Sequence, residues 1–186
     1  AVRYYLLHEI PFANDGTITY DLLIERINSD LANVLGNLVN RTVSMNYKYF
    51  DGIIQEHNVY EDIDSDLIDS VLSLGEKVTA KMDELKVGEA LQEIFDVLRK
   101  CNKYIDDTMP WSLAKDETKK DRLATVLYNL IESIRYGAVL LQAFMLDTAN
   151  KIFEQINTEC KDLKYNEENE YSLNKPTALF MRIDVK

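Results

Sequence analysis

The chain has 186 residues, of which 46% are hydrophobic and 28% charged, a composition that predicts one globular domain with a sizeable core. Its formal net charge of −11 argues against a nucleic-acid surface, because affinity for phosphates comes from Lys and Arg. No apolar run reaches the length of a membrane span, and two His and two Cys are too few to predict a metal site or a His-based nucleophile.

Hydrophobic residues recur at helical spacing along almost the whole chain, and Gly and Pro number only six and three. This pattern predicts an all-α protein, a bundle of four to five long helices joined by short connections. The first element is a short apolar helix over residues 2–10, followed by a turn at 14–16. The chain starts without an initiator Met or a signal-peptide pattern, so we expect a segment cut from a longer, cytoplasmic protein.

The next predicted helix begins after Thr19, a plausible N-cap, and is unusually rich in asparagine. Asparagine is unfavourable inside a helix because its amide competes for backbone hydrogen bonds. Asn37 and Arg41 lie one turn apart at the edge of the apolar stripe, with Arg26 and Asp30 nearby. An amide beside a guanidinium suits the reading of a nucleobase. The apolar stripe itself contains Tyr20, Ile24, Ile27, Leu31, Val34, Leu35, Leu38, Thr42 and Met45.

Two other positions of this helix have structural interpretations. Asn28 lies on the opposite edge of the stripe, where we expect a hydrogen bond to a neighbouring helix. Gly36 points away from the core, where it costs about 1 kcal/mol relative to Ala and lets another group approach the backbone.

An acidic segment follows, and a helix is predicted from 64–66 to about 85, with residues 87–107 as its antiparallel partner. The second of these helices carries Cys101 among its core positions. Cys101 and Cys160 fit neither a zinc site nor a disulfide framework, which favours reduced thiols. The acidic residues are Glu61, Asp62, Asp64, Asp66 and Asp69.

A break is predicted at residues 108–111, where Met109, Pro110 and Trp111 are adjacent. A long helix then runs from about 117 to 146, Asp147 caps a last helix that ends at 156, and the tail over 161–186 is polar and extended. Basic residues gather after the break. They are most simply the solvated start of a helix, and some are candidates for contacts with phosphates: Lys115, Lys119, Lys120 and Arg122.

Taken together, these segments resemble the C-terminal, anticodon-binding part of methionyl-tRNA synthetases, which are class I aminoacyl-tRNA synthetases. The opening residues 1–7 are similar to the stretch that follows the ATP-site KMSKS motif in that family. Residues 28–41 are similar to its first long bundle helix, and 104–115, with Met109-Pro110-Trp111, to its helix-loop-helix. The end, from Pro176 to Asp184, is similar to its tail.

The resemblance implies a division into residues 1–16, the end of the connecting segment from the catalytic domain, 17–160, the anticodon-binding bundle, and 161–186, a tail that folds back towards that domain. It also implies recognition of the CAU anticodon of tRNA(Met). Trp111 would stack on the first anticodon base, Pro110 would fix its loop, and Asn37 and Arg41 would make polar contacts. Lys115 and Lys119 are candidates for contacts with the tRNA backbone.

The catalytic motifs HIGH and KMSKS are absent from the sequence, as is the zinc-bearing insertion. The resemblance therefore implies that the parent protein is an ATP-dependent methionine-tRNA ligase, whereas this fragment alone is inactive. It carries no cofactor of its own, because ATP with Mg, and zinc as a further candidate, belong to the missing catalytic domain. That domain and tRNA(Met) are the expected partners, with no DNA and no membrane.

The sequence departs from the family at two places. Residues 142–147 lack the prolines that are common between the last two helices, so the helix is expected to bend less there or to continue, and Met109 stands where alanine is common. Two alternative functions stay open: the anticodon-binding domain of another class I synthetase (Cys, Leu, Val or Ile), and a helical protein-interaction module. Trp111 by itself would more often be a half-buried packing residue.

Overall fold

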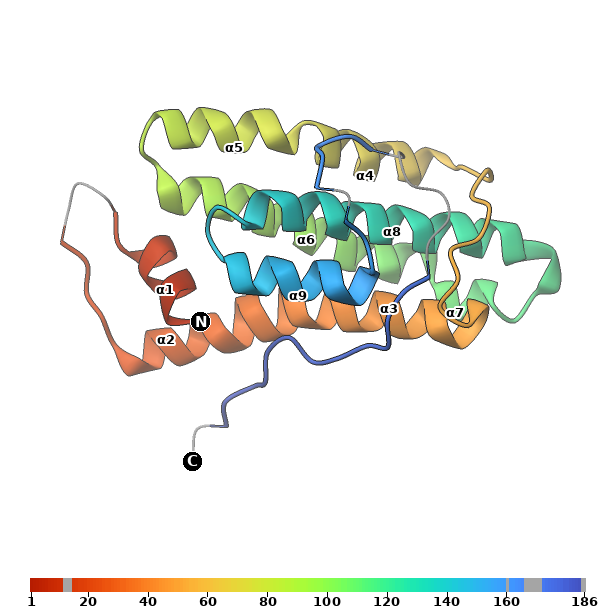
Figure 1. Cartoon of the computed structure of the whole chain (residues 1–186), viewed down its shortest axis with the longest axis horizontal. Coiled ribbons are helices and arrows are strands. Elements are labelled where there is room, and N and C mark those ends of the chain that lie inside the picture. Colours follow the sequence, from red (N-terminus) through yellow and green to blue (C-terminus); the bar gives the residue numbers. More distant parts are fainter. Residues whose placement is uncertain (12–14, 160, 166–171, 185–186) are drawn as a thin grey trace.

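Helices form nearly all of the regular structure in the computed structural model, which describes residues 1–11, 15–159, 161–165 and 172–184 (Figure 1). Within these residues there is no strand of a sheet, only an isolated bridge between Ile53 and Ser172. The predicted all-α bundle is confirmed. None of the described helices is long and apolar enough to cross a membrane.

The first helix, α1 (Val2–Glu9), packs against the first turn of α6 (Val87–Thr108). A Cβ atom on Gly88 would lie 2.9 Å from the carbonyl oxygen of His8, so this approach requires glycine. The predicted turn at 14–16 is only partly described, because Asn14 lies outside the described residues.

The long asparagine-rich helix is continuous from residue 20 to residue 50, and its N-cap is Thr19, whose hydroxyl accepts a hydrogen bond from the Leu22 amide at 3.2 Å. It has three parts: α2 (Tyr20–Arg26), the π-helix η1 (Ile27–Gly36) and α3 (Asn37–Phe50). Leu31, Leu35 and Leu38 are fully buried. Tyr20 was wrongly assigned to the core, because it is 85% exposed in the first turn, before the helix meets the bundle.

The single helix expected over about 64–85 is two helices, α4 (Asp62–Leu72) and α5 (Leu74–Asp83), with a break at Ser73. The start of α4 lies two residues earlier than predicted because Glu61 and Asp64 form a capping box. Asp64 is also fully buried and accepts two hydrogen bonds from Arg122, at 2.7 and 2.8 Å. Arg122 is therefore no part of a solvated basic cluster.

The helix α6 confirms the predicted antiparallel partner, and Cys101 is buried in it, whereas Cys160 lies outside the described residues. After α7 (Pro110–Leu113) and the 3-10 turn η2 (Glu117–Lys119) comes α8 (Lys120–Leu141). The expectation that this helix continues to 146 is wrong. It ends at Leu141 without proline, and α9 (Leu146–Ile156) folds back beside it. The N-cap of α9 is Met145 rather than Asp147.

The described part of the tail, residues 172–184, is extended and runs beside the long helix (Figure 1). Its Leu173 is buried and donates its amide to the carbonyl of Gly52 at 2.7 Å. Asn28 pairs with both backbone groups of Ile183, at 2.9 and 2.8 Å, so its partner is the tail and not the neighbouring helix that was expected. Gly36 is buried beneath the same tail, with the backbone nitrogen of Phe180 3.9 Å from where its Cβ would lie.

Candidate nucleic-acid interface

Asn37 and Arg41 open the α3 segment and face α6, the helix packed beside it. The amide of Asn37 lies 3.5 Å from Oδ1 of Asn102, and Nη2 of Arg41 lies 2.9 Å from Oδ1 of Asp106. Since both pairs are four residues apart on their helices, they form two successive rungs between α3 and α6. The structure therefore brings Asn37 and Arg41 together, as the sequence predicted.

The rungs fix the orientation of these side chains without burying them. The amide of Asn102 donates to the carbonyls of Val34 and Leu98, at 3.1 and 3.2 Å, which leaves its oxygen directed at Asn37. Asn37 is exposed and Arg41 keeps 29% of its side chain accessible. An exposed amide and a guanidinium held at a fixed spacing can present donors and an acceptor to the edge of a base.

Trp111 is presented by a short structure at the end of α6. Met109 adopts a left-handed conformation (φ 45°) that ends the helix, and buried Pro110 occupies the first position of α7. Trp111 follows and remains 41% exposed, which is unusual for the only tryptophan of the chain. The indole is thus half-buried, as a packing residue would be, and the exposed part of its ring is available for stacking.

Trp111 and the partners of Asn37 and Arg41 lie near the C-terminal end of α6. Asp106, the partner of Arg41, precedes Trp111 by five residues, which span at most about 18 Å. No hydrogen bond or ring contact among the described residues joins the indole to Asn37 or Arg41. A ligand several ångströms long could contact both.

The two lysines assigned to the tRNA backbone, Lys115 and Lys119, are exposed on the segment after α7. Neither forms an ion pair with another described residue, in contrast to Arg122, which is committed to Asp64. Their ammonium groups are thus available to an anion on the side of the molecule that carries Trp111.

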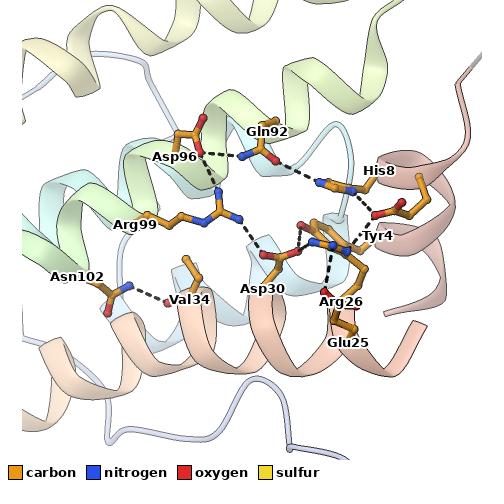
Figure 2. A network of polar contacts seen from close by, with 11 residues as sticks. Tyr4, His8, Glu25, Arg26, Asp30, Val34, Gln92, Asp96, Arg99 and Asn102 are labelled. Atoms are coloured by element: carbon orange, nitrogen blue, oxygen red, sulfur yellow. Dashed lines mark hydrogen bonds and ion pairs between the residues drawn. The ribbon is translucent and has the colours of Figure 1, made fainter. Parts of the chain in front are cut away.

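Arg26 and Asp30, expected near this edge, belong to a separate polar network closer to α1 (Figure 2). Asp30 is 3% exposed and accepts hydrogen bonds from Tyr4, Arg26 and Arg99, at 3.0, 3.0 and 2.8 Å. Burial and the neighbouring Asp30 carboxylate raise the pKa of Tyr4. The network ties α1 and α6 to the π-helix, so it holds the helix that carries Asn37 and Arg41.

Sequence reasoning missed Asn102 and Asp106, the α6 side of both rungs. A usable signal existed, because they lie four residues apart, like Asn37 and Arg41, and offer an amide and a carboxylate to match an amide and a guanidinium. What the sequence lacked was the register between the two helices.

Comparison with known protein families gives two matches. Residues 54–182 match the family described as "Anticodon binding domain of methionyl tRNA ligase". Residues 1–43 match the family described as "tRNA synthetases class I (M)".

Several curated relatives named methionine–tRNA ligase are similar to this chain. The protein of Clostridium acetobutylicum is 56% identical, and the match covers 85% of this chain and 24% of that relative. The protein of Caldanaerobacter subterraneus subsp. tengcongensis is 48% identical, and the match covers 100% of this chain and 30% of that relative. The chain thus spans less than a third of the length of these relatives. Among solved structures, the free form of Mycobacterium tuberculosis methionyl-tRNA synthetase superimposes with a TM-score of 0.92 and 33% identity, over 100% of this chain and 39% of that one.

Proposed function

The chain belongs to the family of anticodon-binding domains of methionyl-tRNA ligase, and we propose that it reads the CAU anticodon of tRNA(Met) as one part of such a ligase. The observation that carries the proposal is the exposed indole of Trp111 at the end of α6, beside the helix rungs that hold Asn37 and Arg41. Membership in this family argues against the alternative that the chain is the anticodon-binding domain of a cysteine, leucine, valine or isoleucine synthetase.

The proposed mechanism follows from how proteins read single-stranded RNA loops. The first anticodon base stacks on Trp111, whose plane is set by Pro110, while Asn37 and Arg41 bond the polar edges of the anticodon bases. Lys115 and Lys119 contact the phosphates and set the position of the loop. Trp111 provides a π-face, and the polar side chains donate hydrogen bonds or carry positive charge, so an anionic, base-bearing ligand fits them. These polar side chains are Asn37, Arg41, Lys115 and Lys119.

The chemistry of the whole ligase is assigned to the part of the protein that this chain does not contain. There, ATP with Mg, and zinc as a further candidate, would serve the attachment of methionine to tRNA(Met). The described residues contain no group of three or more His, Cys, Asp and Glu side chains that could hold a metal ion.

The contacts predict weak binding by the chain alone. Stacking on one aromatic and one good polar contact together contribute roughly 2–6 kcal/mol. That sum corresponds to dissociation constants in the millimolar range and below. NMR titration of the chain with an anticodon stem-loop detects complexes of this strength.

The test compares a CAU stem-loop with one changed at its first anticodon base, using the wild type and Trp111→Ala. We expect the wild type to prefer CAU, and Trp111→Ala to weaken CAU binding by about 1–3 kcal/mol because a stacking plane is lost. Trp111→Phe, which keeps an aromatic ring, should retain part of this affinity.

The stability of each variant is the control. Since Trp111 is 41% exposed, its truncation should lower the urea midpoint less than the loss of a fully buried tryptophan would. Equal binding of both stem-loops by the wild type would refute anticodon reading. A large loss of stability in Trp111→Ala, with RNA binding unchanged, would instead favour a packing or protein-interaction role.

A further inference from the structure

A small cleft lies between the C-terminal end of α3 and the segment after α7. It has a volume of about 150 Å³, and its walls come from α3, α7, η2 and the start of α8. Leu113 in its lining belongs to α7, the short helix that also carries Trp111. Figure 1 shows the end of α3 beside α7 at this end of the bundle.

Two lysines, Lys48 and Lys120, line this cleft. Nζ of Lys48 lies 5.3 Å from the centre of the Tyr49 ring, and Nζ of Lys120 lies 6.0 Å from the centre of the Phe50 ring. Neither lysine is ion-paired with a carboxylate anywhere in the described residues. The arginines of the interior differ, because Arg122 and Arg135 are paired with Asp64 and Glu132.

Two acidic residues also line the cleft, and they are not equivalent. The carboxylate of Asp116 already has hydrogen-bond partners within the chain, because it accepts from the amide and the hydroxyl of Thr118, at 3.0 and 2.7 Å. These bonds lower the pKa of Asp116, so its carboxylate is charged and locally satisfied. Glu117 is exposed and opposes an anion at the rim.

The size of the cleft selects among anionic ligands. Its volume of about 150 Å³ exceeds the space that a single water needs, so a small polyatomic anion can enter it. A phosphate group on the backbone of a longer RNA is an anion of this kind, because the rest of the RNA can stay outside the cleft. The aromatic rings beneath the ammonium groups keep the lysines close to the cleft.

We propose that this cleft binds a backbone phosphate of the tRNA anticodon loop between Lys48 and Lys120. The inference rests on the proposed function and deepens it, because it adds a site that holds the loop independently of its sequence. Trp111, Asn37 and Arg41 then discriminate between bases, whereas Lys48 and Lys120 supply affinity.

The test measures binding of the CAU stem-loop and the changed stem-loop to the chain at several salt concentrations. A phosphate contact with single-stranded RNA contributes about 0.7 to the slope of log affinity against log salt. The double substitution Lys48→Gln/Lys120→Gln should therefore flatten the slope by about 0.7 and weaken both RNAs equally, by about fivefold near 0.1 M salt.

Matched variants separate this site from general electrostatics. Lys77→Gln/Lys151→Gln removes the same charge from α5 and α9, away from the cleft, and should leave the slope unchanged. Lys48→Arg/Lys120→Arg should bind as the wild type does, and Glu117→Gln should strengthen binding of both RNAs.

An unchanged slope in Lys48→Gln/Lys120→Gln, with Trp111→Ala still weakening CAU binding, would overturn the cleft and leave anticodon reading intact. Loss of affinity for CAU alone would also overturn it, because a phosphate contact cannot discriminate between bases. A wild type that binds neither RNA would overturn both proposals.

Discussion

The asparagines of the long helix differ in what they contact. The side chain of Asn28 donates one hydrogen bond to the backbone of Ile183 and accepts one from it. These two bonds hold the tail against the helix. Asn37 remains exposed beside Asn102, and Asn33 and Asn40 are exposed as well. A residue type that is unfavourable in a helix is thus explained at Asn28 by the tail, and at Asn37 by the proposed ligand.

Cys101 provides a prediction at the level of one residue. Burial raises the pKa of its thiol to about 12, so the thiol stays protonated in the folded chain well above neutral pH. We expect a thiol reagent at pH 8 to leave Cys101 unmodified until the chain unfolds. Mass spectrometry of Cys101-containing peptides, with and without denaturant, measures this, and modification of the folded chain would contradict it.

The same pKa shift has a consequence for stability. The unfolded thiol loses its proton near pH 9, whereas the folded one keeps it to about 12. Between these values the folded state binds more protons, so this group's contribution to stability falls as pH rises.

At the residue level the sequence predicted one helix cap, Thr19, correctly and missed the buried polar positions. Thr19 as N-cap follows from local chemistry, because its partner Leu22 is three residues away. Asp30, Asp64 and Arg122 are buried because of partners far along the chain, which no local pattern contains. For the same reason the tail partner of Asn28 could not be predicted.

At the level of elements, the π-helix η1 forms polar contacts with both α1 and α6. Its Asp30 is bonded by α1 and α6, and its Val34 carbonyl accepts from Asn102. A π-helix of ten residues is unusual, and tertiary contacts of this kind compensate for its poorer geometry. The segment sets the rotation at which the following turn presents Asn37 and Arg41.

Asp30→Ala tests the importance of this network. It leaves Arg26, Arg99 and the Tyr4 hydroxyl without their shared acceptor, so we expect a loss of about 2–3 kcal/mol in the free energy of unfolding. This value allows for the partial exposure of Arg26 and Arg99, 22% and 36% of their side chains. Urea unfolding followed by circular dichroism measures it.

Asp96→Ala is the matched control, because it removes another carboxylate bound to Arg99 but one that is 57% exposed. Exposed ion pairs contribute little, so the expected loss is below about 1 kcal/mol. Equal losses in the two variants would show that burial of Asp30 does not matter.

Helix ends were the weak point of prediction for the elements. The breaks at Ser73 and after Leu141 contain no proline or glycine, the residues that mark such breaks in a sequence. They arise because α5 and α9 fold to cover the apolar faces of neighbouring helices. The helix α6 was predicted well because Met109 and Pro110 mark its end and its apolar spacing is regular.

At the scale of the molecule, the proposed function places RNA on an acidic protein. The net charge of −11 argued against nucleic acid, but this sum hides how the charges are arranged. Asp30, Asp64 and Glu132 are buried with arginine partners, whereas Lys48, Lys115, Lys119 and Lys120 gather around α7 without carboxylate partners among the described residues. Asp116 and Glu117 lie between these lysines in the sequence, so what supports the proposed function is the absence of ion pairs between these lysines and other described residues, and not a surface free of acidic residues.

The fluorescence of Trp111 tests the central claim most directly, since it is the only tryptophan and reports on stacking without any substitution. Titration with the CAU stem-loop should quench the indole in a saturable way, with weaker quenching by the stem-loop changed at its first anticodon base. If saturating CAU RNA, with binding verified by NMR, left the fluorescence of Trp111 unchanged, the base would not stack there and the account would be contradicted.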